Sequence, residues 1–404
     1  MAKRFLILIF SLSMSFVLTG CDKDVFPAKG EIDKYEVVQV FGIDRCKEDP
    51  SNVEITLIAE KAKMSSGKGG ESGGGAKSYE ILSSTGKTVF EAERILKSHT
   101  DKKMFFGYTE YFLIGEDAAK DDIVKYFDFV IRGHEIRLSP KVFIVSGCSI
   151  KDFVNQTSST DKYVVDMLQN IESEINDMSN FGQLQIIDVA NMLNDDSSAA
   201  IIPVLKCGDI KDEKIVGGEL PEKDPETCGY AIIKDFKLVG YIEEDISRGY
   251  NFLVGKVKSS PISIKDVTGM NVCLEVINEI TDVKARFNGD TLEGVTYKTH
   301  IYSNIVEQQS KDDLVSQEDI DDLSKKQSDV IKAEMEAVIG LSKKYEIDCT
   351  NLGDKIRIRH PLKWEKIKDK WKEVYPNIKI DVEVTSDLRR IYDIAEPIGY
   401  KFES

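Results

Sequence analysis

Histidine and tryptophan are scarce in this chain of 404 residues, which holds four histidines and two tryptophans. The histidines, His99, His134, His300 and His360, are far apart in the sequence, and no two cysteines have the spacing of a zinc site. We therefore expect no metal and no cofactor. A catalytic triad assembled only in space stays open at this point, because its members need no sequence proximity.

A complete phosphate-binding loop is also missing. The segment Ser84-Thr85-Gly86-Lys87-Thr88 resembles one, but Ile81 occupies the position where such a loop needs its first glycine. Without that glycine the backbone amides cannot wrap a phosphate. Thr88 is therefore predicted to cap the helix that follows it. The acidic runs at 211–226 and 312–322 lack the alternating ligand order of a calcium loop, and we interpret them as solvated surface.

Basic residues are fewer than acidic residues in this chain. The chain has 54 lysines and arginines against 70 aspartates and glutamates, which gives a net charge of −16. A surface of this sign repels nucleic acid and anionic lipid, so we expect no nucleic-acid partner. Beyond the first twenty residues no apolar run approaches the length of a membrane span.

The N-terminus carries the strongest signal in the sequence. Lys3 and Arg4 precede an apolar run over 5–18, and Leu18-Thr19-Gly20-Cys21 closes it. This pattern predicts a lipoprotein signal peptide over 1–20, in which Leu18, Thr19 and Gly20 are recognised by the signal peptidase. Cys21 is predicted to carry a diacylglycerol and to become the first residue of the mature protein, followed by a polar tether over 21–30.

Two alternatives to lipidation are an uncleaved membrane anchor and an ordinary signal peptide with a chance cysteine. An apolar core of about fourteen residues is short of the roughly twenty that span a bilayer, and Asp22, Lys23 and Asp24 follow at once. A two-chain lipid also has suitable energetics, because one acyl chain alone anchors only marginally. We therefore favour lipidation.

The remaining chain is too long for one average domain. Alternating apolar strands and amphipathic helices predict an α+β (mixed α/β) fold with several domains, each a mixed sheet with packed helices. We expect an N-terminal α/β domain over 31–207, which could divide into two subdomains near residue 150. An acidic linker over 208–227 and a C-terminal α+β domain over 228–404 would follow.

Several local features carry specific expectations. Residues 105–114 are predicted to form one apolar strand, and residues 230–242 a hairpin that opens the C-terminal domain. Asn288-Gly289-Asp290 predicts a tight turn, Ser316 a helix cap, and the stripe of Trp364 and Trp371 a buried helix face.

Six cysteines remain besides Cys21, and most lie in or beside apolar runs, which favours buried, unpaired thiols. Cys207 and Cys228 flank the acidic segment and are the one pair that we expect could form a disulfide.

Short motifs along nearly the whole chain resemble the C-subunit lipoproteins of spore germinant receptors, the GerAC-type family. In order, they are the lipobox, Val40-Phe41-Gly42-Ile43-Asp44, the glycine-rich segment at 67–75, residues 86–92, Phe105-Phe106-Gly107, Tyr111 to Glu116, Phe127-Asp128-Phe129, Glu135-Ile136-Arg137, Leu238-Val239-Gly240-Tyr241 and Trp364 to Val384. The chain departs from the family at its predicted mature start, where the tryptophan that commonly follows the lipidated cysteine is absent.

This resemblance implies a receptor subunit on the outer face of the spore inner membrane, working with two integral membrane subunits to trigger germination. It also implies a fold of mixed α/β domains and no enzymatic activity. As a hypothesis, Phe105, Phe106 and Tyr108 belong to a surface that contacts the partners, because exposed aromatic residues suit recognition. The alternative is that they are core residues, since neighbours on a strand point to opposite faces and one of Phe105 and Phe106 should be buried.

Two other functions remain open. A lipid-anchored solute-binding or hydrolytic protein of the cell envelope would have a deep cleft between its domains, with convergent polar groups. A purely structural envelope lipoprotein would leave germination unchanged when its gene is deleted.

Overall fold

The computed structural model describes residues 34–60, 79–133, 135–157, 164–179, 182–207, 226–310 and 316–389. The predicted signal peptide, Leu18, Thr19, Gly20, Cys21, the tether and residues 208–225 of the expected linker lie outside the described residues, so their roles stay predictions. Within the described ranges, no helix combines the length and the apolar character needed to cross a bilayer.

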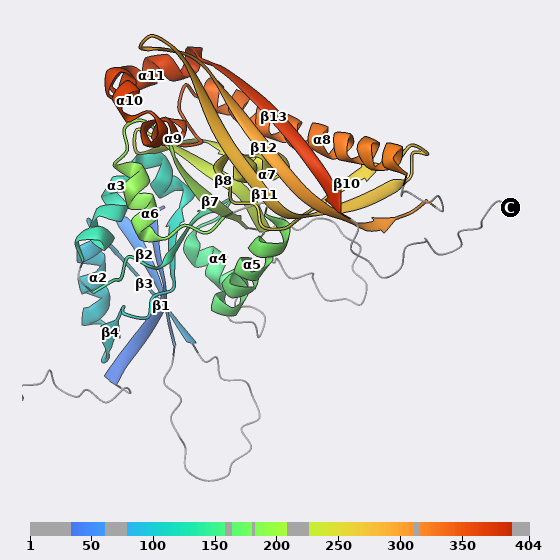
Figure 1. Cartoon of the computed structure of the whole chain (residues 1–404). Coiled ribbons are helices and arrows are strands. Elements are labelled where there is room, and N and C mark those ends of the chain that lie inside the picture. Colours follow the sequence, from blue (N-terminus) through green and yellow to red (C-terminus); the bar gives the residue numbers. More distant parts are fainter. Residues whose placement is uncertain are drawn as a thin grey trace, which may run out of the picture.

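A nine-stranded mixed sheet forms the first part of the described chain (Figure 1). Its strands, in spatial order, are β3 (Tyr79–Gly86), β2 (Val53–Glu60), β1 (Tyr35–Arg45), β5 (Tyr111–Gly115), β6 (Lys141–Ser146), β7 (Ala200–Lys206), β8 (Glu226–Lys234) and β9 (Lys237–Ile242), with the short β4 (Lys103–Phe105) beside the start of β1. The central strands β1, β5, β6 and β7 run parallel, and antiparallel strands flank them on both sides. Parallel strands need crossover connections, and the helices supply them.

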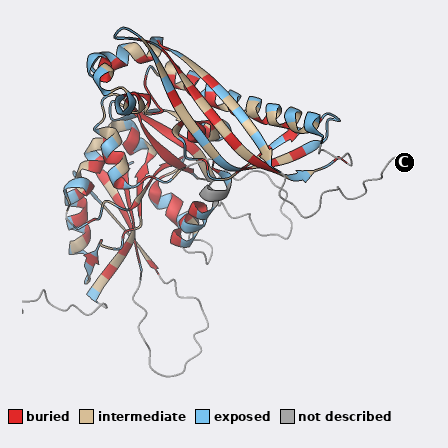
Figure 2. Cartoon of the chain, viewed as in Figure 1, coloured by how far each residue is buried: buried red, intermediate tan, exposed pale blue. Residues whose placement is uncertain are grey.

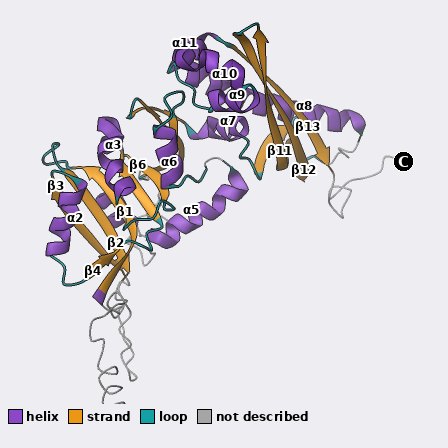
Figure 3. Ribbon diagram, turned by 60° about the vertical axis from the view of Figure 1, so that its left-hand side comes forward, coloured by secondary structure: helices purple, strands orange, loops and turns teal. Residues whose placement is uncertain are grey.

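Helices cover both faces of this sheet. On one face lie α2 (Val89–Ser98), α3 (Glu116–Arg132) and α6 (Ile186–Leu193), and on the other α4 (Ile150–Thr157) and α5 (Val164–Met178). Figure 3 shows α2 and α5 on opposite sides of the sheet. Along β5, Tyr111 and Leu113 enter one core while Phe112 and Ile114 enter the other, as the two-residue period of a strand requires.

A second, four-stranded sheet forms the other part of the molecule. Its order is β10 (Ser260–Lys265), β11 (Asn271–Asn288), β12 (Thr291–Gln308) and β13 (Lys379–Arg389). The predicted tight turn joins β11 to β12, with Gly289 at φ +58°. Figure 2 shows burial alternating along β11 and β12, whereas the central strands of the first sheet are buried almost continuously. One face of the second sheet is therefore open and the other is packed.

Helices cover the packed face. The long α8 (Gln317–Lys344) begins at Ser316, whose hydroxyl accepts a hydrogen bond from the backbone N–H of Asp319 at 3.1 Å, so the predicted cap is confirmed. Trp364 and Trp371 are buried as predicted, with ring centroids 5.1 Å apart. They lie in the short elements that follow α8, which are α9 (Leu352–Arg359), α10 (Pro361–Ile367), η2 (Lys368–Lys370), α11 (Trp371–Val374) and η3 (Tyr375–Asn377).

Hydrogen bonding places the predicted hairpin in the first sheet, not in a separate C-terminal sheet. β8 pairs with β7 across the acidic segment, and β9 pairs with β8. The next helix, α7 (Glu244–Val254), then packs on α8, where Arg248 binds Glu334. The sheet also continues past residue 150, because β7 pairs with β6. Where one domain ends and the next begins stays a prediction.

Two local expectations were wrong. Residues 105–114 do not form one strand: β4 ends at Phe105, a turn closed by the Thr109 N–H and the Phe106 carbonyl follows, and β5 begins at Tyr111. Cys207 is joined to Cys148, not to Cys228, because both residues follow the ends of the neighbouring parallel strands β6 and β7, with Cα atoms 6.1 Å apart. The mixed α/β fold with two sheets and packed helices is confirmed.

Candidate functional site

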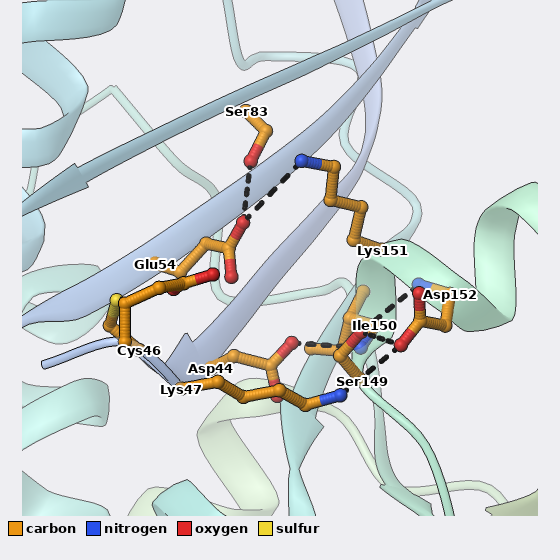
Figure 4. Close-up of polar contacts among 10 residues, drawn as sticks. Asp44, Cys46, Lys47, Glu54, Ser83, Ser149, Ile150, Lys151 and Asp152 are labelled. Carbon is orange, nitrogen blue, oxygen red and sulfur yellow. Dashed lines mark hydrogen bonds and ion pairs between the residues drawn. The ribbon is translucent and has the colours of Figure 1, made fainter. Parts of the chain in front are cut away.

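The carboxyl ends of the central parallel strands are the first place to look for a site, because ligands of open α/β sheets bind there. Asp44 lies near the end of β1 and is 6% exposed. Its Oδ2 accepts a hydrogen bond of 2.8 Å from the backbone N–H of Ile150, the first residue of α4 (Figure 4). The carboxyl group therefore joins the central strand to the N-terminus of a helix more than one hundred residues away in sequence.

Gly115, at the end of β5, makes room for this carboxyl group. A Cβ atom at that position would lie 1.7 Å from Oδ1 of Asp44. A side chain at position 115 would collide with the Asp44 carboxyl group, so only glycine lets the ends of β1 and β5 lie side by side here.

Burial raises the pKa of Asp44 to about 7, although the Ile150 N–H favours the charged form and lowers it in part. The negative charge of Glu54 raises it further. The carboxyl group of Asp44 thus changes its charge near neutral pH, which is unusual for a carboxyl group. Such a raised pKa occurs both in functional sites and in buried carboxyl groups with a purely structural role.

The polar groups around Asp44 are satisfied by one another, as Figure 4 shows. Glu54 accepts a hydrogen bond from Ser83 at 3.0 Å, and Lys47 binds Asp152 at 3.2 Å. Asp152, in the first turn of α4, also accepts a hydrogen bond of 2.6 Å from Ser149, the residue before the helix. These contacts hold the end of the β1–β2 pair against α4.

The described part of the chain contains no group of three or more histidine, cysteine, aspartate or glutamate residues that could hold a metal ion. The segment resembling a phosphate loop is also accounted for. Thr88 Oγ1 accepts from the Glu91 N–H at 3.1 Å, and the Glu91 carboxylate accepts from the Lys87 N–H at 2.7 Å. Thr88 is a helix cap, as predicted, and Glu91 reaches back to the backbone of the residue before the cap.

The three aromatic residues proposed as a partner surface differ in exposure. Phe105 is 41% exposed and Tyr108 is 68% exposed, but Phe106 is 3% exposed and packs on Phe41. Phe106 is therefore core and not part of a contact surface, because the turn after β4 directs its ring onto Phe41. Whether Phe105 and Tyr108 contact a partner stays a prediction.

Tyr35, at the start of β1, joins the two exposed residues. Its ring centroid lies 6.1 Å from that of Phe105, which lies 5.8 Å from that of Tyr108. We call Tyr35, Phe105 and Tyr108 the aromatic tip. Beside it is a hollow of about 600 Å³, lined by Tyr35, Lys97, Glu135 and residues 100–106. The sequence could suggest Phe105 and Tyr108, but not Tyr35, which becomes a neighbour only through the parallel pairing of β4 with β1.

A larger cleft of about 1080 Å³ lies between the end of α6 and the helices α9 to α11. Its lining is mostly polar and charged, over a base that includes Trp364 and Trp371. Several charged groups bind each other or the backbone: Asp354 binds Arg357 at 2.5 Å, and Asp188 accepts from the backbone N–H at the N-cap of α6. No sequence motif predicts this cleft, because its walls come from segments about 160 residues apart.

Comparisons with known proteins cover both parts of the chain. The family model described as "Spore germination protein N-terminal domain" matches residues 28–207, and the one described as "Spore germination B3/ GerAC like, C-terminal" matches residues 228–392. They leave out 208–227, the segment expected to be a linker.

Two curated proteins of Bacillus subtilis (strain 168) are similar to this chain. Spore germination protein KC is 24% identical over 425 aligned positions, which cover 100% of both chains. The putative spore germination protein YfkR is 21% identical over 379 positions, which cover 93% of each chain. Among solved structures, the crystal structure of the GerBC protein matches with a TM-score of 0.50 at 16% identity, covering 86% of this chain and 96% of that one. This last likeness concerns the fold alone.

Proposed function

Because the chain belongs to the GerAC-like family of spore germination proteins, we propose that it is the lipid-anchored C subunit of a spore nutrient germinant receptor. The observation that carries this proposal is the extent of the match. Both family models apply, in the expected order, and the similarity to spore germination protein KC runs over the full length of both chains.

The proposed mechanism is binding and assembly without catalysis. The diacylglycerol on Cys21 holds the protein on the outer face of the spore inner membrane, where it associates with two integral membrane subunits. A nutrient then shifts a conformational equilibrium that the three subunits share. In support, the conspicuous buried carboxyl group of the first sheet, Asp44, has a structural role, because it joins β1 to the backbone N–H at the start of α4.

Membrane fractionation and purification of the complex test this proposal. The tagged chain, isolated from spore membranes, should bring two integral membrane proteins with it, and its N-terminal peptide should carry the mass of a diacylglycerol on Cys21. Cys21→Ala should leave the chain outside the membrane fraction and without these proteins. Cys273→Ala, which changes a cysteine of the second sheet, should behave like the unchanged chain. Full membrane retention of Cys21→Ala would contradict lipid anchoring.

A second candidate function, binding of a small solute, is favoured by the cleft between α6 and the C-terminal helices. This function predicts that an amino acid, sugar or nucleoside raises the melting temperature of the purified chain. Asn191→Trp, which fills the cleft from α6, should remove that effect. If no compound of such a panel shifts the melting temperature, solute binding is contradicted and the assembly function stands alone.

A further inference from the structure

The aromatic tip is exposed but firmly held. Phe106 is buried against Phe41 with centroids 5.7 Å apart, and this contact fixes the turn that carries Tyr108. A Cβ atom at Gly107 would come within 2.6 Å of the Phe105 ring, so glycine lets that ring fold over the turn. The two exposed rings, Phe105 and Tyr108, are therefore presented in a fixed arrangement beside the half-buried ring of Tyr35.

The aromatic tip lies where the chain leaves the proposed anchor. Twelve residues lie between Cys21 and Lys34, the first described residue, and Tyr35 follows Lys34. A chain of this length spans at most about 45 Å. In Figure 1 the start of β1 and β4 lie at the lower end of the molecule, while α10 and α11 lie at the upper end. The tip therefore belongs to the end that the lipid holds near the bilayer.

The charges at this end are nearly balanced, whereas the whole chain is strongly acidic. The hollow beside the tip is lined by three lysines, Lys97, Lys102 and Lys103, and by two acidic residues, Asp101 and Glu135. Lys102 binds Glu36 at 3.1 Å and Lys97 binds Glu135 at 3.1 Å. Lys103 is exposed and forms no ion pair with a described residue. Exposed aromatic rings beside lysines are the composition found at membrane–water interfaces.

The size of the aromatic tip favours a lipid surface over a protein partner. Three rings and one lysine cover far less than the roughly 800 Å² that each side of a stable protein interface buries. A contact made beside an existing anchor needs much less area, because the anchor already keeps the tip at a high effective concentration near the membrane.

We propose that the aromatic tip, with Lys103, is a second membrane contact that enters the interfacial layer of the bilayer holding the lipid on Cys21. This inference rests on the proposed anchoring of the chain. The contact orients the protein with β1 and β4 at the membrane surface and with the second sheet directed away from it. The bilayer chemistry that it fits is a phospholipid headgroup layer, where Lys103 meets lipid phosphate and the rings lie at headgroup depth.

Tryptophan fluorescence tests this contact, because the two native tryptophans are buried in the C-terminal helices. The full chain with Tyr108→Trp is bound through its lipid to vesicles of phosphatidylglycerol and phosphatidylcholine, with and without bromine on the acyl chains. We expect bromine to quench the added tryptophan by at least one third and to leave the unchanged chain unaffected. Leu362→Trp, at an 82% exposed position of α10, is the control and should not be quenched. Equal quenching at the two positions, or none at position 108, would overturn the proposal.

A photoreactive benzoylphenylalanine at position 108 in spore membranes separates lipid from protein as the occupant. Lipid adducts at position 108, at least tenfold above those at position 362, are the expected result. A protein adduct at position 108 would overturn the proposal in favour of the partner surface considered for Phe105 and Tyr108.

A failure of the anchor can be told apart from a failure of the tip. A chain with Cys21→Ala, held on nickel-chelating lipid through an N-terminal histidine tag, is tethered whether or not Cys21 is lipidated. Quenching of Tyr108→Trp in this form supports the contact even where the natural anchor fails. No quenching in either form overturns the contact and leaves the anchor as a separate question.

Discussion

At the scale of single residues, Asp44 links the folding stability to pH. Its pKa of about 7 in the folded chain lies above its ordinary value of 3.8, so between these values the folded state binds the proton more tightly than the unfolded state. The contribution of this group to stability is therefore present at low pH and falls as the pH rises from about 4 to about 7. About three pKa units correspond to at most about 4 kcal/mol.

Replacing Asp44 by asparagine should remove this dependence. The free energy of unfolding, measured with urea at pH 5 and pH 8, should fall less between these values in Asp44→Asn than in the unchanged chain. Asp152→Asn is the control, because hydrogen bonding to Ser149 lowers the pKa of Asp152 below its ordinary value of 3.8. Asp152 therefore stays charged between pH 5 and pH 8, and its replacement should leave the fall in stability over this range unchanged. An unaltered pH dependence in Asp44→Asn would show that Asp44 is charged throughout this range.

Gly115 and Asp44 should be energetically coupled. Gly115→Ala places a methyl group on Oδ1 of Asp44 and should cost about 2 kcal/mol or more in the free energy of unfolding. In an Asp44→Ser background the same substitution should cost less than half as much, because the clashing atom is gone. Equal costs in the two backgrounds would contradict the contact.

Residue roles that depend on the local sequence could be predicted. The caps at Thr88 and Ser316 were foreseen, because a capping residue and its helix are neighbours in the chain. The role of Asp44 could not, because its partners Gly115 and Ile150 reach it only through the pairing of the sheet and the packing of α4.

At the scale of elements, the Cys148–Cys207 disulfide joins the ends of the parallel strands β6 and β7. It closes a loop of 59 residues, and in the chain-entropy view such a cross-link stabilises a protein by about 4 kcal/mol. The double variant Cys148→Ala with Cys207→Ala should therefore have a lower urea midpoint than the unchanged chain. Dithiothreitol should lower the midpoint of the unchanged chain and leave that of the double variant as it is. Cys273→Ala should leave the response to dithiothreitol intact. A midpoint that does not respond to dithiothreitol in the unchanged chain would contradict the disulfide.

The sequence pointed to Cys207 but to the wrong partner. Cys228 is closer along the chain, whereas Cys148 is closer in space because a crossover containing α4, α5 and α6 returns the chain to a strand beside β6. The parallel pairing of β6 with β7 has no short sequence motif that predicts it, because a long crossover separates the two strands. The β11–β12 hairpin could be predicted, because its tight turn is a motif of neighbouring residues.

The contact between α7 and α8 depends on a glycine. A Cβ atom at Gly249 would lie 2.4 Å from the backbone carbonyl oxygen of Glu334, which cannot move aside. Gly249→Ala should therefore lower the free energy of unfolding by about 2 kcal/mol or more. Gly340→Ala is a matched control within α8, because nothing lies within 4 Å of the added atom. It should raise stability by up to about 1 kcal/mol, and equal effects of the two substitutions would contradict the close packing.

At the scale of the whole molecule, alternating apolar strands and helices sufficed to predict the mixed α/β class. They did not predict that β8 and β9 extend the first sheet beyond the acidic segment, because pairing across a long connection depends on a sheet edge that only the folded chain provides. The cleft and the aromatic tip are features of the same kind. Both are assembled from segments that the fold brings together.

The two ends of the molecule are suited to different tasks in the proposed receptor. The end with β4 and the start of β1 carries the aromatic tip, close in sequence to the predicted anchor. The other end carries the second sheet, one face of which is open along β11 and β12. An orientation with the first end on the bilayer leaves that open face available to other proteins.

The most direct test of the central claim is nutrient-triggered release of dipicolinic acid from spores that lack the gene. We predict that the deletion abolishes the response to at least one nutrient, that the unchanged gene restores it, and that Cys21→Ala does not. These spores should still germinate when the receptors are bypassed. A normal response of the deletion spores across a full panel of nutrients, in a strain without related receptors, would contradict the claim that this chain is a germinant receptor subunit.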